Sequence, residues 1–333
     1  MPATVHDVAR VAGVSIKTVS NVVNNYAHIS PQTKRKVLEA IDQLGYTPNL
    51  AARNLRMGKS GVIGLIIPDL RNVYFAELAA DVMRAAERHG LAVLIQMVSD
   101  RKTETAALHG SRIQMTDGVL YSALALGQED VDLLDIPTPM VLLGDRIFNG
   151  PKDHVTIQNT EGAKRATQHL IETGRRKILV LGSHEGELIG SAGLRLEGYR
   201  QGLEEADLGY DRSLVYHAGT WLRSDGAHAM REALEAKVVF DAVFALNDAL
   251  ALGALRVLQE AGLRIPSDVA LIGFDDIDET RYSSPTLSTI DPGRTEIAER
   301  AVHALVQRMN GKIDIPPREI PADFRLVVRE STS

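Results

Sequence analysis

Several apolar segments of this 333-residue chain end in an acidic, amide or basic side chain. Asp69 follows VIGLIIP and Asp275 follows VALIGF, while Asn247 comes directly after AVFAL and the pair Asp145 and Arg146 comes after MVLLG. Carboxylates accept hydrogen bonds from neighbouring hydroxyl groups, and a guanidinium donates a planar fork of them. These residue types therefore predict a binding site for a small, hydroxyl-rich molecule such as a sugar.

Aromatic side chains near these segment ends are candidates for stacking on the apolar face of a sugar ring. The single tryptophan, Trp221, follows LVYHAG, and Tyr74 and Phe75 begin a long helical pattern. A lone tryptophan is more often part of a hydrophobic core than of a binding site, so the sequence leaves both interpretations of Trp221 open.

A second set of residues near the amino terminus has the spacing of a DNA-reading element. The stretch DVARVAGVSIKTVSNVVN predicts two short amphipathic helices, over 5–12 and 16–23, joined by a tight turn at Gly13. On the outer face of the second helix, Ile16, Lys17 and Asn21 have side chains that can contact base edges in a major groove. Side chains suited to phosphate oxygens are Ser15, Thr18, Ser20, Asn24 and Thr33. An ordinary three-helix bundle with a polar face is the alternative.

Charge is distributed unevenly along the chain. Residues 1–60 hold eight Lys and Arg but only three Asp and Glu, although the whole chain has a net charge of −6. A basic head on an acidic body favours a polyanionic partner at one end. The chain has no cysteine and no long apolar run, so we expect a cytoplasmic protein that does not engage a membrane.

Motifs for catalysis, cofactors and metals are missing from the sequence. It contains neither GxGxxG nor GxxxxGK(S/T), and neither HExxH nor GxSxG. The histidines show no paired ligand spacing, and HEGE at 184–187 is interpreted as a polar loop. We therefore expect no enzyme activity, no cofactor and no metal.

The elements that position these residues fall into two groups. Ser30 and Pro31 predict the start of a third helix that runs through Gln43, and Gly45 its stop. From Val62 onward, near-continuous apolar strands alternate with amphipathic helices, which predicts two doubly wound parallel-sheet subdomains. The segments 154–159 and 287–292 are expected to cross between them, and the helix 296–309 to return to the first.

The segments VHDVARVAGVSIKTVSNVVN and ISPQTKRKVLEAIDQLGYTPNLAARNL resemble the head and hinge of the LacI/GalR family of bacterial transcription regulators. The segments SGVIGLIIPDLRNVYFAEL, RLEGYRQGLEE, FALNDALALGAL and RIPSDVALIGFDD resemble that family's effector-binding core, so the resemblance covers almost the whole chain. It implies an all-α helix-turn-helix head and a hinge helix, followed by a periplasmic-binding-protein-like α/β core. The expected boundaries are 1–45 for the head, 46–59 for the hinge, 60–157 (completed by about 291–318) for the first subdomain and 158–290 (completed by about 319–330) for the second.

The resemblance also assigns roles to individual residues. It implies that Leu55, with Asn49 and Ala52, contacts the minor groove, and that Arg195 and Asp275 bind the effector. At position 21 many relatives have arginine where this chain has asparagine, so the operator half-site is expected to differ from the commonest one.

Taken together, these features predict a homodimeric repressor that binds a palindromic operator and is released by a small sugar. Two alternatives stay open. In one, a corepressor or protein partner enhances operator binding; in the other, the chain is a sugar-binding protein without a DNA function.

Overall fold

The computed structural model describes residues 3–23, 26, 28–46, 59–311 and 316–333. Contacts within the chain divide it into two units, residues 1–61 and residues 62–333, and each unit is described by itself. The first unit contains three helices, α1 (Val5–Ala12), α2 (Ile16–Val23) and α3 (Pro31–Leu44). The second unit contains two lobes, each built around a parallel sheet.

Local capping residues determine where the three helices of the head begin and end. Thr4 and Asp7 form a capping box at the start of α1, and Gly13 ends that helix in the left-handed conformation with φ 64°. Ser30 caps α3 at the Thr33 N–H, with Pro31 in its first turn. The predicted bounds of α1 and α2 are confirmed, and α3 ends one residue later than predicted.

A small apolar core joins the three helices of the head. Val8, Val19 and Val37, one from each helix, are fully buried and belong to the same cluster. Because Val19 and Val22 face this core, the opposite side of α2 is free to face a partner.

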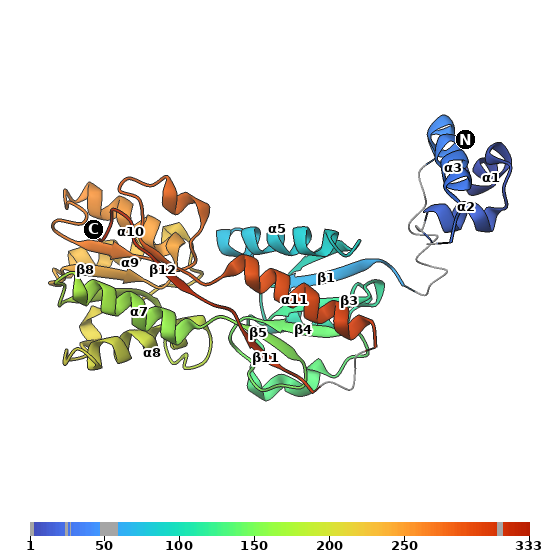
Figure 1. Cartoon of the computed structure of the whole chain (residues 1–333). Helices are drawn as coiled ribbons and strands as arrows, with labels where there is room; N and C mark the ends of the chain where they lie inside the picture. Colours follow the sequence, from blue (N-terminus) through green and yellow to red (C-terminus); the bar gives the residue numbers. More distant parts are fainter. Residues whose placement is uncertain (1–2, 24–25, 27, 47–58, 312–315) are drawn as a thin grey trace. The chain divides into compact units, whose positions relative to one another are not determined.

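The first lobe has a six-stranded parallel sheet in the order β11-β5-β4-β3-β1-β2 (Figure 1). Along β1, Ile63, Leu65 and Ile67 pack towards α5 and α11, whereas Ile66 packs on the opposite face towards α6. Burial on both faces explains the near-continuous apolar strands of the sequence. The elements of this lobe are β1 (Val62–Ile67), α5 (Val73–Glu87), β2 (Ala92–Met97), α6 (Arg101–His109), β3 (Gly118–Ser122), β4 (Met140–Leu143), β5 (Asp153–Thr156), α11 (Arg294–Met309) and β11 (Glu319–Pro321).

The second lobe has a four-stranded parallel sheet in the order β7-β6-β8-β9. Leu179 and Leu181 of β6 pack towards α9 and α10, while Ile178 and Val180 pack towards α7 and α8. Its elements are α7 (Asn159–Glu172), β6 (Ile178–Ser183), α8 (Ser191–Glu204), β7 (Val215–His217), α9 (Arg223–Glu235), β8 (Ala242–Ala245), α10 (Asp248–Glu260) and β9 (Ala270–Ile272), with the antiparallel pair β10 (Thr289–Asp291) and β12 (Arg325–Val327).

Three segments of the chain connect the two lobes, after β5, after β10 and after β11 (Figure 1). Two hydrogen bonds join the first and third of them, from Gln158 Nε2 to the Ala322 carbonyl (2.8 Å) and from the Ala322 N–H to the Thr156 carbonyl (3.0 Å). The sequence assigned residues from about 319 to the second subdomain, but β11 pairs with β5 in the sheet of the first lobe. The chain therefore returns to the second lobe only after Pro321.

Candidate functional site

A cavity of about 520 Å³ lies between the two lobes of the core. Its walls come from the segments that follow β1, β2, β3 and β4 in the first lobe, and from those that follow β6, β7 and β9 in the second. Ligands of doubly wound sheets bind beyond the carboxyl ends of the strands, so the position of this cavity is the one that the fold predicts.

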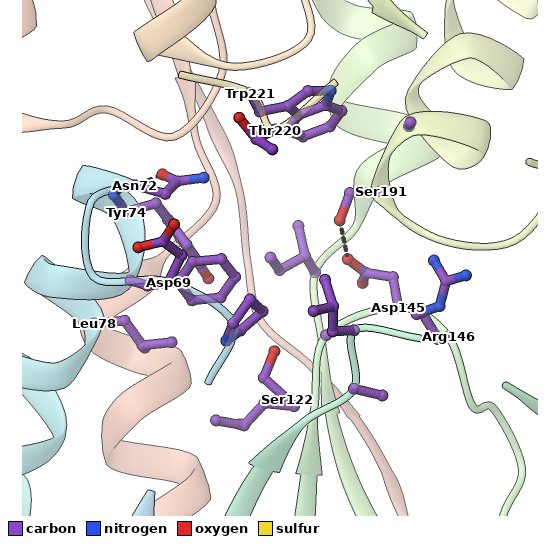
Figure 2. Close-up of a pocket in the computed structure, with 18 of the residues that line it drawn as sticks. Asp69, Asn72, Tyr74, Leu78, Ser122, Asp145, Arg146, Ser191, Thr220 and Trp221 are labelled. Atoms are coloured by element: carbon purple, nitrogen blue, oxygen red, sulfur yellow. Dashed lines mark hydrogen bonds between the residues drawn. The ribbon is translucent and has the colours of Figure 1, made fainter. Parts of the chain in front are cut away.

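The cavity brings together most of the residues that the sequence singled out for effector binding (Figure 2). Eight of the nine predicted residues line it: Asp69, Tyr74, Phe75, Asp145, Arg146, Arg195, Trp221 and Asp275. This shared location supports their assignment, although their contacts with an effector remain a prediction.

Asn247, the ninth predicted residue, does not line the cavity. Its side chain is fully buried, where Oδ1 accepts the N–H of Leu250 (2.8 Å) and caps α10. Its Nδ2 donates to the main-chain carbonyl of Trp221 (3.1 Å). The amide is thus already used within the protein, and its role is to hold the segment that carries Trp221.

Arg195 and Asp275 form a buried pair in the cavity wall. Arg195 is 2% exposed and Asp275 is 4% exposed, and Nη1 of the arginine lies 3.3 Å from Oδ1 of the aspartate. The guanidinium also donates from Nε to Asn159 Oδ1 (2.7 Å) and stacks on the ring of Phe274, with Cζ 3.6 Å from the ring centroid. These contacts fix the donor fork in one orientation.

The backbone and the burial of Asp275 are both unusual for an aspartate. Its φ of 120° lies in a region that side-chain-bearing residues rarely adopt, which is typical of functional sites. Burial raises its pKa to about 6, although the charges of Arg195 and Arg294 oppose the rise. The carboxyl group is therefore positioned to change its charge in the physiological pH range.

The position of Trp221 is compatible with both of the interpretations that the sequence left open. It packs against the core clusters of the second lobe, yet it also lines the cavity. Its Nε1 donates to the Gly182 carbonyl (2.7 Å), which fixes the plane of the indole. Figure 2 shows Trp221 across the cavity from Tyr74 and Leu78. A fixed ring at this position is suited to stacking on an apolar sugar face.

Asp145 belongs to the first lobe, and its side chain contacts the second lobe at the cavity wall. Its Oδ2 accepts a hydrogen bond from the Ser191 hydroxyl (2.8 Å), which Figure 2 shows as a dashed line. Among the described residues, its buried Oδ1 has no hydrogen-bond partner. A buried carboxylate oxygen in that state needs a donor from a ligand or from water.

Several cavity residues were not predicted as effector contacts. His184 and Glu187 come from the HEGE segment, which was interpreted as a polar loop; the segment is a loop, and both residues line the cavity. The sequence did contain a signal for these two residues, because their segment directly follows the buried strand β6. Others that line the cavity are Arg71, Asn72, Ser122, Ser191 and Thr220.

Glu104 holds one wall of the cavity without lining it. This carboxylate is fully buried and accepts the Tyr121 hydroxyl (2.6 Å) and the N–H groups of Leu124, Ala125 and Leu126. Because the segment 122–124 lines the cavity, Glu104 fixes the shape of that wall. The sequence offered no sign of this role, since a glutamate within α6 is ordinarily solvated.

In the head, the predicted base-reading residues lie on the side of α2 that faces away from the core. Ile16 and Lys17 are exposed and Asn21 is half-buried. The hydroxyl of Ser15 is hydrogen-bonded to that of Thr18, and the hydroxyl of Thr33 to that of Ser30, each at 2.8 Å. Ser20 is half-buried on α2. The predicted DNA contacts Asn24, Asn49, Ala52 and Leu55 lie outside the described residues.

The described residues contain neither a candidate membrane-spanning helix nor a candidate metal site. No helix among them is long and apolar enough to cross a membrane. Likewise, no group of three or more His, Cys, Asp or Glu side chains in the described ranges is arranged to hold a metal ion.

Comparisons with known proteins identify the family. Residues 4–49 match the model of the bacterial regulatory proteins of the lacI family, and residues 167–332 match a periplasmic binding protein-like domain. The HTH-type transcriptional repressor PurR of Haemophilus influenzae (strain PittEE) is 34% identical, over 99% of this chain and 98% of that protein. The chain belongs to the lacI family of bacterial regulatory proteins.

This lacI-family chain also resembles solved structures over its whole length. The Lac repressor dimer bound to operator and the anti-inducer ONPF is 27% identical with a TM-score of 0.82, covering 100% of this chain and 99% of that one. A complex of the transcriptional regulator CelR with cellobiose is 30% identical with a TM-score of 0.73, covering 99% of both chains. The predicted fold is confirmed, and the chain is a DNA-binding transcriptional regulator, not an enzyme.

Proposed function

We propose that this lacI-family regulator is a homodimeric repressor that binds a palindromic operator and is released when a small sugar occupies the cavity between its lobes. The observation that carries the proposal is the cavity wall itself. A rigidly held guanidinium at Arg195, carboxylate acceptors at Asp275 and Asp145, and the indole of Trp221 all line the same cavity. Hydrogen-bonding groups together with a stacking surface are what a sugar requires.

The head supplies the DNA-binding half of the proposal. Helix α2 buries Val19 and Val22 and presents Ile16, Lys17 and Asn21 on its outer side. We assign Asn21 to an adenine, Lys17 to a guanine or a phosphate, and Ile16 to a thymine methyl group. We assign the hinge residues Asn49, Ala52 and Leu55 to the minor groove, as the family resemblance implies. The target is operator DNA, which places the regulator in the cytoplasm.

An apolar sheet edge supports dimerisation. Strand β2 lies at one end of the six-stranded sheet, and its Leu94 and Met97 are exposed. Met83 of the adjacent helix α5 is also exposed. Large exposed apolar side chains gathered at an unpaired edge are typical of a protein interface. Two heads in a symmetric dimer read two half-sites, which is why the operator is proposed to be palindromic.

Contacts across the cavity explain how a sugar changes the protein. Asp145 of the first lobe accepts a hydrogen bond from Ser191 of the second, and Arg146 lies 3.7 Å from Glu187. A sugar inserted between these groups changes the relative free energies of the open and closed lobes. It shifts operator binding only by its difference in affinity for the two states, typically 1 to 3 kcal/mol.

Thermal-shift measurements on the full chain test the effector class. A bound sugar raises the melting temperature by mass action, so a panel of mono- and disaccharides should contain at least one that stabilises wild type but not Arg195→Lys. A panel that stabilises neither protein would contradict a sugar effector. If the stabilising sugar strengthens operator binding, the corepressor alternative replaces release.

A further inference from the structure

We propose that the effector is an uncharged sugar and that the cavity rejects sugars carrying a phosphate group. This inference rests on the proposed function, because it defines more narrowly the sugar that the same cavity binds. The charge balance of the cavity wall carries it.

Two of the arginines that line the cavity are held by aspartates of the same wall. Nη2 and Nε of Arg71 converge on one oxygen of Asp69, Oδ2, at 2.7 and 2.8 Å. Arg195 has its Nη1 3.3 Å from Asp275 Oδ1 and donates its Nε to Asn159. A phosphate is ordinarily held by two-point arginine contacts. Here Nε and Nη2 of Arg71 already have an acceptor in Asp69, and Nε and Nη1 of Arg195 have acceptors in Asn159 and the Leu246 carbonyl. Within the described ranges, one nitrogen of each guanidinium is left, which suits a single hydroxyl group but not a two-point contact with a phosphate.

The remaining two basic side chains of the wall share one carboxylate. His184 Nδ1 lies 2.8 Å from Glu187 Oε2, and Arg146 Nη1 lies 3.7 Å from the same oxygen. Arg146 is the more weakly held of the two. Figure 2 shows its guanidinium pointing away from Tyr74 and Asp69, whereas the carboxylate of Asp145 in the same segment points towards Ser191. Arg146 therefore offers little to an anion at the centre of the cavity.

The amino terminus of helix α8 could attract an anion, but protein carboxylates already occupy it. Asp145 accepts the hydroxyl of Ser191, the first residue of α8, and Glu187 accepts the N–H of Gly193. Negative charge from the protein thus fills the position that a ligand phosphate would take at such a terminus.

After these internal contacts, the cavity wall offers a ligand more hydrogen-bond acceptors than donors. Asp69, Asp145, Glu187 and Asp275 line the cavity, and Oδ1 of Asp145 is buried without a hydrogen-bond partner among the described residues. A sugar hydroxyl donates to such an oxygen, whereas an ionised phosphate has no proton to give and repels it. Binding a phosphate would also break an internal ion pair and leave a buried carboxylate unpaired.

Matched pairs of sugars test this selectivity directly. Cellobiose, maltose and trehalose are titrated into the full chain by calorimetry, each beside its own 6-phosphate. We expect the unphosphorylated member of a binding pair to bind at least about tenfold more tightly, which corresponds to about 1.4 kcal/mol. A 6-phosphate that binds as tightly as its parent overturns this inference and leaves the sugar effector in place. If no member of any pair binds and no sugar of the thermal-shift panel stabilises the protein, the sugar effector itself is contradicted, and this inference fails with it.

Two variants test the origin of the selectivity. Glu187→Gln leaves His184 and Arg146 without their shared carboxylate, so affinity for the 6-phosphate should rise about tenfold. Asp145→Asn should weaken the unphosphorylated sugar about tenfold, because it removes a charged acceptor. The controls are Glu197→Gln and Asp132→Asn, which make the same changes at exposed positions outside the cavity. If both cavity variants keep the wild-type preference, charge balance is not its source.

Discussion

Nη1 of Arg195 lies 3.3 Å from Oδ1 of Asp275, and both side chains are almost completely buried at the wall of the cavity between the lobes. The guanidinium is fixed from the other side by Asn159 and by the ring of Phe274. Neither charged group can move far without leaving the other buried and unpaired, a loss that is strongly destabilising. The pair therefore offers a ligand a rigid donor and a rigid acceptor side by side.

Replacing Asp275 should separate effector binding from DNA binding. In Asp275→Asn, affinity for the sugar that stabilises wild type should fall by about 1.5 to 3 kcal/mol, because a charged hydrogen-bond acceptor is lost. Operator affinity without sugar should stay at the wild-type level. Calorimetry and fluorescence anisotropy measure the two quantities. Asp207→Asn, an exposed change in the same lobe, is the control. Normal sugar affinity in Asp275→Asn would exclude this residue from the site.

Sugar affinity should depend on pH through Asp275. Its pKa in the folded protein is about 6, raised by burial, so protonation below that pH removes the carboxylate that accepts hydroxyl groups. Affinity should fall about tenfold at one pH unit below this pKa. The pKa of His184 is raised by its hydrogen bond to Glu187, and this side chain also lines the cavity, so His184→Asn is the comparison. Asp275→Asn should remove the acid branch of the profile, and a profile unchanged in that variant would assign it to another group.

The raised pKa of Asp275 also makes the stability of the folded protein depend on pH, in the direction opposite to that of sugar affinity. The folded protein holds the proton of Asp275 more tightly than the unfolded chain does, so the contribution of this group falls as the pH rises from about 4 to about 6. Denaturant titrations at several pH values should show wild type losing stability relative to Asp275→Asn across that window. A relative gain would mean that the carboxylate is already ionised in the folded state.

Asn21 should determine part of the operator preference. Asn21→Ala is expected to weaken binding to a selected operator by about 1 to 3 kcal/mol and to relax the preference at one base pair in each half-site. Salt-controlled titrations against single-base variants of the operator measure both effects. Gln43→Ala, exposed in the last turn of α3, serves as the control. Retained affinity with unchanged base preference would move the reading face elsewhere.

Asp153 should stabilise the segment that leads into β11, after which the chain returns to the second lobe. This aspartate is 1% exposed and accepts hydrogen bonds from Arg308 of α11 and from Arg318, which comes just before β11. Asp153→Asn should cost towards the lower end of about 3 to 5 kcal/mol, because both arginines are partly exposed and keep some solvation. Chemical denaturation measures the loss, with Asp132→Asn as the control.

The Asp153 effect should also fade in acid. Burial alone would raise the pKa of Asp153, but the hydrogen bonds from Arg308 and Arg318 outweigh it and lower the pKa to about 2. Its contribution is therefore complete above about pH 4 and is lost as the pH falls towards 2. The difference between wild type and Asp153→Asn should shrink over that range. A constant difference would indicate a packing defect instead of a lost ion pair.

Local rules account for what the sequence predicted well. Ser30, Pro31 and Gly45 act within a few residues, so the bounds of α3 were predictable to within one residue. The rule that ligands bind at the carboxyl ends of parallel strands located Asp69, Asp145 and Asp275 without knowledge of the three-dimensional structure. Both inferences need only the pattern along the chain.

What the sequence did not reveal depends on contacts between distant segments. Asn247 has the right residue type at the right strand end, but its amide is used by Leu250 and Trp221 and does not line the cavity. Conversely, Glu187 lies close to Arg146 of the other lobe. No local sequence pattern predicts a contact between two segments so far apart along the chain. The place of β11 beside β5 is a matter of sheet order, which strand patterns alone do not specify.

One titration tests the central claim most directly. The full chain is bound to a labelled palindrome selected by the protein from a random DNA pool, and the sugar that stabilises it in thermal-shift assays is added while fluorescence anisotropy is recorded. We predict that the sugar releases the DNA from wild type and leaves Asp275→Asn bound at the same concentration. Equal release from both proteins, or tighter DNA binding by wild type, would contradict a repressor that is released by a sugar held at Asp275.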